Sequence, residues 1–277
     1  MLKNSDIAFE GMVDRNFPNN ISSAKEIVPL LVKAINPKSV TDVGCGMGQW
    51  LYIFNKNGVK NIKGIDGNWL KDKNILLEKE QIIYHDLENC SGLKIEKSDL
   101  AVSLEVAEHI SEQQANNFVD FLVSIADVVY FSAATPYSGG VHHVNEKWQM
   151  YWIRKFAKRG YKAIDYIRPK IWNNRKVCYF YKEESFIFVK EAALDKYPIL
   201  KNYVQEPIFD LVHPVHFTDQ VIKPTHEWSY LLEIQRRLLI SYKQKVQNEF
   251  FRCRRYCNHE KKILNGLYKC YKNWTYK

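Results

Sequence analysis

Residues 39–50 read Ser-Val-Thr-Asp-Val-Gly-Cys-Gly-Met-Gly-Gln-Trp, a short apolar run followed directly by a glycine-rich turn. The run predicts a buried strand over 39–43, and the apolar spacing over 49–57 predicts a helix. A glycine-rich turn between a strand and a helix lets the backbone approach a ligand closely and points the helix N-terminus at it. The stretch therefore predicts the first strand–turn–helix unit of a nucleotide-binding α/β domain.

Strands and helices are predicted to alternate outward from this unit. Ser22 or Ser23 is expected to cap a helix that ends at Asn36-Pro37. Further strands are predicted over 63–66, 81–84, 100–104 and 128–132, with a helix over 111–126 before the last of them. A later helix is expected over 145–159, and later strands over 163–167 and 185–189. This order predicts a central, mostly parallel sheet with helices on both faces.

The residues around the glycine turn restrict its ligand. A phosphate-binding loop needs Gly-Lys-Ser/Thr at its end, and a dinucleotide fold expects Gly-x-Gly-x-x-Gly. Here the spacing is Gly-x-Gly-x-Gly and Asp42 precedes it, which would repel a pyrophosphate but suits an ammonium and a sulfonium. The second strand ends on Asp66, which is placed to accept ribose hydroxyls. The third ends on Asp86-Leu87, which is placed to bind an adenine edge.

Four stretches, VTDVGCGMGQWL, GIDG, YHDLE and SLEVAEHI, resemble the successive motifs of class I S-adenosylmethionine-dependent methyltransferases. They occur in order over residues 40–135. The resemblance implies a Rossmann-like fold with S-adenosyl-L-methionine as cofactor. It implies these cofactor contacts: Asp42, Gly44, Gly46, Gly48 and Glu105 at the methionine part or reacting centre, Asp66 at the ribose, and Asp86 and Leu87 at the adenine.

A second resemblance concerns the methyl acceptor. The stretch GGVHHVNEKWQMYW, residues 139–152, is similar to a segment of bacterial methyltransferases of surface-polysaccharide (capsule and glycan) biosynthesis. The match covers His143 to Glu146 and Trp148. The sequence departs from that group at 181–184, where Tyr-Lys-Glu-Glu stands in place of an expected Tyr-Arg-Gln-Asn. The resemblance implies methyl transfer to an oxygen of a small molecule or sugar.

The acceptor chemistry leaves two alternatives. A sugar hydroxyl needs a base in the transition state, and His143 is the first candidate, with His109 expected near the cofactor cleft as the second. A carboxylate or phosphate acceptor needs cationic anchors instead, for which His143, Lys147, Arg154 and Arg175 are candidates. No metal is expected, because no spacing requires ligands to converge on one point. The expected acceptor-binding set is Tyr137, His142, Asn145, Trp148 and Arg175.

The charge of the chain is concentrated at its C-terminal end. Residues 223–277 hold thirteen Lys/Arg and four Asp/Glu, so that the net charge of +9 lies entirely there. We predict a methyltransferase domain over 1–190, with 1–21 as a polar lead-in, and an extension over 191–277. The extension is expected to contain a long amphipathic helix over 226–252 that packs on the domain or forms a homodimer. A nucleic-acid methyltransferase and a non-catalytic nucleoside-binding protein are the weaker alternatives, since only the basic tail supports nucleic-acid binding.

The six cysteines follow no framework spacing, so reduced thiols and a cytoplasmic location are expected. Cys253 and Cys257 lie one helical turn apart near His259 and Cys270, but this spacing alone does not predict zinc. No transmembrane segment and no signal peptide are expected, because no apolar run is long enough.

Overall fold

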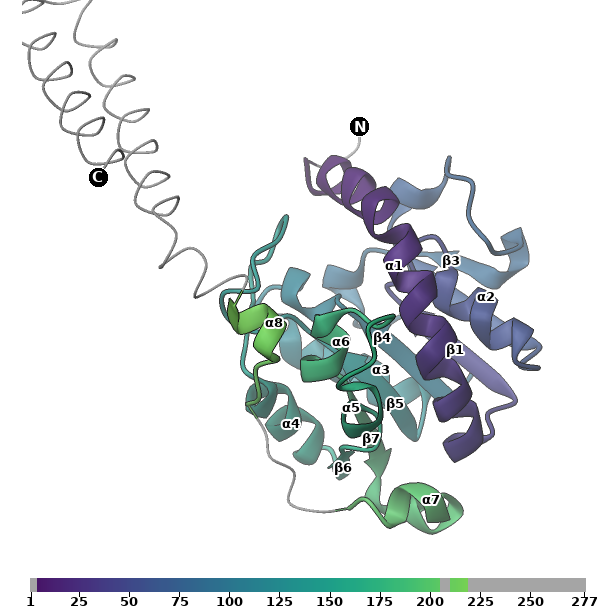
Figure 1. Ribbon diagram of the computed structural model, residues 1–277. Helices are drawn as coiled ribbons and strands as arrows, with labels where there is room; N and C mark the ends of the chain where they lie inside the picture. Colours follow the sequence, from purple (N-terminus) through teal and green to yellow (C-terminus); the bar gives the residue numbers. More distant parts are fainter. Residues whose placement is uncertain (1–3, 205–209, 219–277) are drawn as a thin grey trace, which may run out of the picture. The chain divides into compact units, whose positions relative to one another are not determined.

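The computed structural model describes residues 4–204 and 210–218 of the chain (Figure 1). These residues belong to one compact unit, Met1–Gln220. Its centre is a seven-stranded sheet with helices packed on both faces. The predicted α/β class is therefore confirmed.

The sheet contains β1 (Ser39–Val43), β2 (Asn61–Asp66), β3 (Ile82–Tyr84), β4 (Leu100–Leu104), β5 (Val128–Ser132), β6 (Tyr161–Ile164) and β7 (Phe186–Lys190). The strand order is β3-β2-β1-β4-β5-β7-β6. The strands are parallel except β7, which runs antiparallel to both β5 and β6. This is the topology of the Rossmann-like class I methyltransferase fold. The order reverses between β1 and β4, and in such sheets ligands bind at the strand ends beside this switch point.

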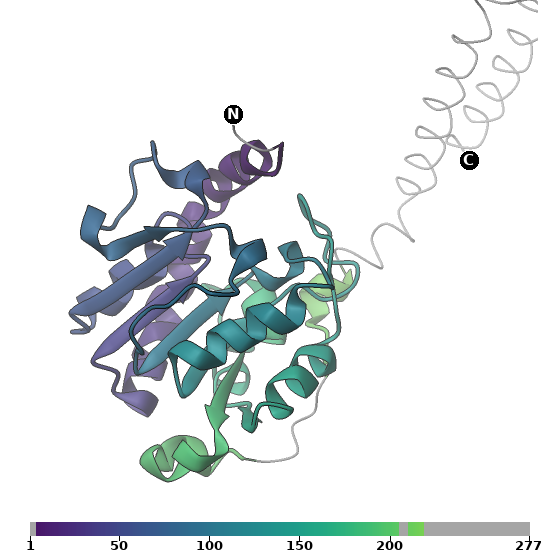
Figure 2. The ribbon, with the colours of Figure 1, turned by 180° about the vertical axis from the view of Figure 1, so that it is seen from behind.

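Two apolar cores lie on the two faces of the sheet because successive strand side chains point to opposite faces. On β5, Val128 and Tyr130 belong to one core while Val129 and Phe131 belong to the other. The first core contains residues of α1 (Asn4–Ile35) and α2 (Gln49–Lys56), and the second contains residues of α3 (Ala115–Ile125) and α4 (Gln149–Ala157). Figure 1 shows α1 in front of the sheet, and Figure 2 shows α3 and α4 in front of the opposite face.

The remaining helical elements are short. The α-helices are α5 (Arg168–Ile171), α6 (Tyr179–Glu184), α7 (Pro198–Lys201) and α8 (Pro214–His216). The 3₁₀ helices are η1 (Asn68–Leu70), η2 (Lys79–Gln81), η3 (Leu87–Asn89), η4 (Ala107–His109) and η5 (Glu191–Lys196). The connections from β2 to β3 and from β3 to β4 therefore contain 3₁₀ turns where a doubly wound sheet often carries full helices.

The N-terminal prediction was wrong. One helix runs from Asn4 to Ile35, with Pro18 inside it, instead of a polar lead-in followed by a helix capped at Ser22 or Ser23. The two serines bind elsewhere: the Ser22 hydroxyl donates to the Lys176 carbonyl at 2.8 Å, and the Ser23 hydroxyl accepts from the Cys178 N–H at 3.1 Å. These contacts span more than 150 residues, so the local sequence pattern carried no sign of them.

Several later boundaries also differ from prediction. The helix expected over 111–126 lies at Ala115–Ile125. The helix expected over 145–159 begins only at Gln149, because the N–H groups of Val144 and Asn145 both donate to the Glu108 carbonyl at 2.9 Å. The strand expected over 163–167 lies at Tyr161–Ile164. Beyond residue 190, η5, α7 and α8 continue within the same compact unit. The domain division after residue 190 stays a prediction.

Several expectations concern residues outside the described part of the chain. These are the helix over 226–252, the homodimer through it, and the group formed by Cys253, Cys257, His259 and Cys270. Among the described cysteines, Cys45, Cys90 and Cys178 are free thiols. Within residues 4–204 and 210–218, no helix combines the length and apolar character that crossing a membrane requires.

Candidate active site

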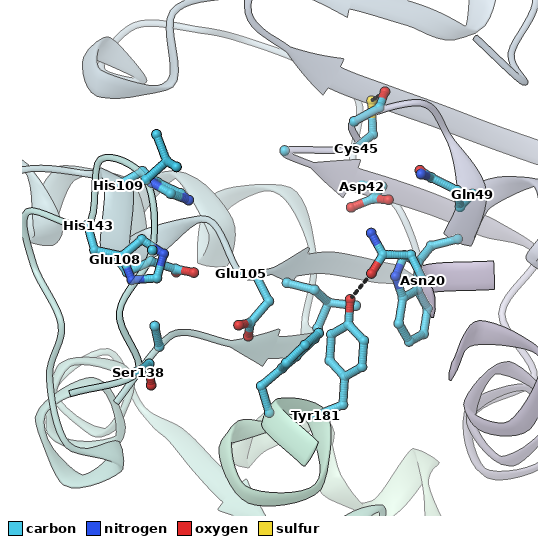
Figure 3. Close-up of a pocket in the computed structure, with 18 of the residues that line it drawn as sticks. Asn20, Asp42, Cys45, Gln49, Glu105, Glu108, His109, Ser138, His143 and Tyr181 are labelled. Atoms are coloured by element: carbon cyan, nitrogen blue, oxygen red, sulfur yellow. Dashed lines mark hydrogen bonds between the residues drawn. The ribbon is translucent and has the colours of Figure 1, made fainter. Parts of the chain in front are cut away.

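A cavity of about 410 Å³ opens at the carboxyl ends of β1 and β4, beside the switch point of the sheet (Figure 3). It is lined by Asn20, Asp42, Gly44, Cys45, Gly46, Gln49, Trp50, Leu104, Glu105, Glu108, His109, Ala134, Ser138, Gly139, Gly140, Val141, His143, Tyr179, Phe180 and Tyr181. Asp42, Gln49 and Asn20 lie on one side of it, and His109, His143 and Glu108 on the other, with Glu105 between them. Within the described part of the chain, three carboxyl groups line the cavity and no lysine or arginine does.

The glycine loop needs glycine at its first position for two reasons. Gly44 has a φ of +84°, in the left-handed region that disfavours side chains. A Cβ atom at this position would lie 2.2 Å from Cγ2 of Val106, which follows β4. The Gly44 N–H donates to the Ile65 carbonyl at 2.8 Å. The loop is therefore held against the ends of both neighbouring strands, which brings its backbone to the cavity wall.

The carboxylate of Asp66, at the end of β2, holds the glycine loop in place through hydrogen bonds. Its Oδ2 accepts from the Gly46 N–H at 2.8 Å, and its Oδ1 accepts from the Gly67 N–H at 2.6 Å and from Trp69 Nε1 at 2.9 Å. Burial raises the pKa of Asp66 to about 6, although these three donors oppose the shift. Asp66 does not line the cavity, and its carboxylate instead joins the end of β2 to the glycine loop.

The acids that line the cavity are deeply set. Asp42 and Glu108 are buried, and burial raises the pKa of each well above its ordinary value, with a further contribution from Asp66 and Glu105 respectively. Burial also raises the pKa of Glu105 to about 7. The Ser132 hydroxyl donates to Glu105 Oε1 at 2.7 Å, and Glu105 itself has a φ of +57°. A non-glycine residue held in this conformation at a cavity is typical of a functional site.

Two imidazoles form the opposite wall. Nδ1 of His109 donates to the His142 carbonyl at 3.1 Å, and Nδ1 of His143 lies 2.8 Å from Glu146 Oε1. The two ring centroids are 4.9 Å apart and the rings meet edge to face. Burial lowers the pKa of His109 to about 4, and the neighbouring His143 lowers it further, so His109 is neutral at physiological pH. A neutral imidazole that donates through Nδ1 carries its lone pair on Nε2.

The floor of the cavity is stabilised by the segment that departs from the polysaccharide-methyltransferase pattern. Glu184 Oε1 accepts from the Thr135 N–H at 2.9 Å. Glu183 is fully buried and accepts from the His213 N–H at 2.6 Å and from Nδ1 of His216 at 2.5 Å. The Tyr181 hydroxyl donates to Asn20 Oδ1 at 3.1 Å. These acids therefore have structural partners within the fold, where the family pattern has an arginine and two amides.

The cavity gathers six of the sequence-predicted site residues: Asp42, Gly44, Gly46, Glu105, His109 and His143. The others do not line it: Gly48, Asp66, Asp86, Leu87, Tyr137, His142, Asn145, Trp148 and Arg175. Gly48 precedes α2, and Asp86 accepts from the Glu88 N–H at the start of η3. Tyr137 is 78% exposed and Trp148 42% exposed, Arg175 is exposed, and Asn145 is buried.

Sequence reasoning missed several lining residues. Glu108 is the most consequential, and its position beside His109 in a short turn was the one available signal. Asn20 lay in the stretch that was expected to be a polar lead-in. The contributions of Gln49, Trp50, Ser138 and the aromatic run Tyr179–Tyr181 depend on how distant segments pack, and no local motif marks them.

Glu105→Gln is expected to raise the melting temperature at alkaline pH. Because the pKa of Glu105 is about 7 in the folded protein, against an ordinary value of 4.5, the folded state holds a proton that the unfolded chain releases. Stability therefore falls as pH rises from about 4.5 through 7. Glutamine keeps the acceptor for Ser132 and avoids this cost, which we put at about 1–3 kcal/mol at pH 8.

Thermal denaturation at pH 5 and pH 8 measures this effect. The variant is expected to match the wild type at pH 5 and to exceed it at pH 8. Glu96→Gln, at an exposed position, is the matched control and should leave the pH dependence unchanged. If the melting temperatures of the wild type and Glu105→Gln change with pH to the same extent, the pKa of Glu105 is not raised in the folded protein.

Comparisons with known proteins find a distant likeness. No family model matches the chain, and no curated protein matches it. A solved structure of the plantazolicin methyltransferase BpumL, in complex with a pentazolic desmethylPZN analog and SAH, is similar at 16% identity over 66% of this chain and 89% of that chain, with a TM-score of 0.48. Magnesium protoporphyrin IX methyltransferase from Synechocystis PCC 6803, with bound SAM, is similar at 17% identity over 64% and 83%, with a TM-score of 0.45.

An O-methyltransferase family protein from Burkholderia thailandensis is similar at 8% identity and a TM-score of 0.46. The match covers 65% of this chain and 57% of that protein, so the chain spans little more than half of its length. Identities and scores at this level describe a remote similarity. The fold assignment stands on the strand order and the single antiparallel strand described above.

Proposed function

We propose that the chain is a methyltransferase that binds S-adenosylmethionine in the cavity beside β1 and β4. The observation that carries this proposal is the charge of the cavity. Asp42, Glu105 and Glu108 line it together with the glycine loop, and among the lining residues that the structure describes there is no lysine or arginine. Phosphate-bearing nucleotides would be repelled by these acids. A ligand with an ammonium and a sulfonium would be attracted, and more strongly so in a partly desolvated cavity.

The remaining cofactor contacts follow from the order of the strands. With the methionine part between Asp42 and Glu105, the ribose would extend toward the end of β2 and the adenine toward the end of β3, where Asp86 and Leu87 lie. Oδ1 of Asp66 already accepts from Gly67 and Trp69. Binding of a ribose hydroxyl at Asp66 would therefore replace the Trp69 donor, and we expect the Trp69 side chain to move when the cofactor binds.

The acceptor would bind on the histidine side, across the cavity from Asp42. Methyl transfer is an in-line displacement, so the acceptor oxygen must face the methyl group opposite the departing sulfur. We propose an oxygen of a small molecule or sugar as the acceptor. Its hydroxyl must lose a proton as the new bond forms, and the imidazoles of His109 and His143 lie on that wall together with the Glu108 carboxyl.

An anionic acceptor is the second candidate, and the charges of the described residues favour it less. Lys147 pairs with Glu112 at 2.8 Å, while Arg154 and Arg175 are exposed and do not line the cavity. The three lining acids would repel a carboxylate or phosphate. A surface-polysaccharide sugar as acceptor rests on the resemblance of 143–148 alone. A nucleic-acid acceptor rests on the basic residues after 222, outside the described part of the chain.

Asp66→Ala is expected to weaken S-adenosylmethionine binding by about 10- to 100-fold. It removes a carboxylate that orders the glycine loop and that we propose as the ribose acceptor, and hydrogen bonds to charged groups are each worth about 1.5–3 kcal/mol. Calorimetric titration of the purified full chain measures the affinity. Asp72→Ala, at an exposed position on the same connection, is the control and should bind as the wild type does. Equal affinities for both variants would refute the cofactor site.

A further inference from the structure

We propose that Glu108, His109 and His143 bind a divalent transition-metal ion. One ligand atom from each residue lies within 4.8 Å of the others. Figure 3 shows the three side chains together on one wall of the cavity. Two imidazoles and one carboxylate form a ligand set that divalent ions of the first transition row accept.

The hydrogen bonds of the two histidines prepare them for this role. Metal-binding histidines commonly donate one ring N–H to a carboxylate or backbone carbonyl, which fixes the ring and leaves the other nitrogen as ligand. His143 has its Nδ1 2.8 Å from Glu146 Oε1, and His109 has its Nδ1 3.1 Å from the His142 carbonyl. Both Nε2 atoms are thereby assigned the lone pair that a metal ion requires.

The environment of the Glu108 carboxyl group supports a metal ion independently. The side chain is 1% exposed, and its Oε2 has no hydrogen-bond partner among the described residues. A carboxyl oxygen without a partner in a buried position is costly unless another group compensates it. Glu108 is the middle residue of the turn Ala107–His109, and its carbonyl accepts from the N–H groups of Val144 and Asn145. The same backbone contact therefore joins the loop of His143 to the turn of Glu108 and His109.

The distances require a small contraction on binding. Metal–ligand bonds to nitrogen and oxygen are about 2.0–2.2 Å long, so two ligands of one ion lie at most about 4.4 Å apart. A movement of less than an ångström from the present separation satisfies this limit. Gly140 sits against the His143 ring, since a Cβ atom there would lie 2.2 Å from His143 Nε2. This close approach restricts where the ring can move.

The ion would also explain how an acceptor hydroxyl is activated. Three protein ligands leave open coordination positions, and an oxygen bound at one of them has a lowered pKa. His143 would then act as a ligand, because Nε2 cannot bind the ion and accept a proton at once, and the proton of the metal-bound hydroxyl would pass to solvent water. This activating role rests on the proposed methyl transfer, whereas the binding of the ion does not.

Titration of the full-length protein with Mn²⁺, followed by the electron paramagnetic resonance of the free ion, tests the proposal. Mn²⁺ suits this test because it prefers oxygen ligands over thiolates, so that cysteine side chains compete little for it. We expect one site in the wild type. Glu108→Gln and His143→Ala are expected to weaken it by about 100-fold or more, and Glu146→Gln, which removes only the negative charge of the group that His143 Nδ1 contacts, by about 10- to 100-fold.

His142→Asn is the matched control, since it removes the adjacent imidazole, keeps the carbonyl that His109 uses, and places a residue that tolerates the φ of +67°. It should bind Mn²⁺ as the wild type does. Melting temperatures report whether each variant is folded, and Glu146→Gln keeps the test decisive if a ligand variant does not fold. Absence of a site in the wild type, or equal binding by the wild type and folded Glu108→Gln, His143→Ala and Glu146→Gln, would overturn the proposal. If the wild type binds S-adenosylmethionine but does not bind Mn²⁺, the metal site alone is overturned. If it binds Mn²⁺ but does not bind S-adenosylmethionine, the proposed function alone is overturned.

Discussion

Gly44→Ala is expected to abolish measurable S-adenosylmethionine binding and to destabilise the fold by about 2–5 kcal/mol. The added Cβ would lie 2.2 Å from Val106, and the φ of +84° would strain any side chain. Backbone strain of this kind costs about 1–3 kcal/mol, and overpacking adds about as much. Either the loop or the turn after β4 must move, and both line the cavity. Calorimetry and thermal denaturation measure the two effects.

Gly58→Ala separates these causes. Gly58 has a φ of +95°, but an added Cβ would meet no atom within 4 Å. This control therefore carries the backbone strain without the collision, and its affinity for the cofactor should be that of the wild type. If Gly58→Ala and Gly44→Ala lose stability and affinity to the same extent, the close approach of the loop to Val106 is not what shapes the site.

His143→Ala is expected to lower kcat by about 10²–10⁴-fold while the affinity for S-adenosylmethionine stays within a few-fold of the wild type. His143 lies on the wall opposite Asp42, so its loss removes the acceptor machinery and spares the proposed cofactor contacts. Single-turnover methyl transfer with candidate sugars and small hydroxyl compounds, read by mass, measures the rate.

Val144→Ala is the control for general disturbance of this loop. Its side chain is 58% exposed and its backbone N–H, which donates to Glu108, is kept. The variant should turn over as the wild type does. A wild-type rate in His143→Ala, with an acceptor confirmed for the native protein, would show that the acceptor lies elsewhere.

Local sequence pattern predicted the parts of the fold that depend on local causes. The strands over 39–43, 100–104 and 128–132 have the predicted bounds, and the first two are closed by the glycine turn and by Glu105 respectively. The full length of α1 was missed because Ser22 and Ser23 bind residues 176–178, which no nearby residue reveals. The direction of β7 is likewise a property of long-range pairing with β5 and β6.

The residues of the candidate site likewise fall into those that the local sequence predicts and those that only the tertiary structure reveals. Asp42, Gly44 and Gly46 were predicted to stand together because they share one turn, and they do line one cavity. The predicted acceptor residues Tyr137, Trp148 and Arg175 do not line it, although Trp148 belongs to the stretch that resembles the polysaccharide methyltransferases. The pairing of Glu108 with His143 arises because the loop after β5 folds back onto the turn after β4. A contact of that kind becomes visible only with the tertiary structure.

The buried carboxyl groups of the cavity lower the stability of the ligand-free protein, and the same groups would attract the proposed cationic ligand. Asp42, Glu105 and Glu108 are held where burial raises the pKa of each, so that the protein without a ligand keeps carboxyl groups close together at the end of the sheet. A cationic ligand would stabilise the ionised forms of these groups. Binding should therefore strengthen as pH rises from about 6 to 8, since the ionised form of Glu105 is the one that attracts it.

Calorimetric titration of S-adenosylmethionine into the purified full-length chain measures whether the acid-lined cavity binds this cofactor. We expect one site per chain with micromolar affinity, stronger at pH 8 than at pH 6. Absence of binding at either pH, together with saturable binding of a dinucleotide or nucleoside triphosphate, would contradict it.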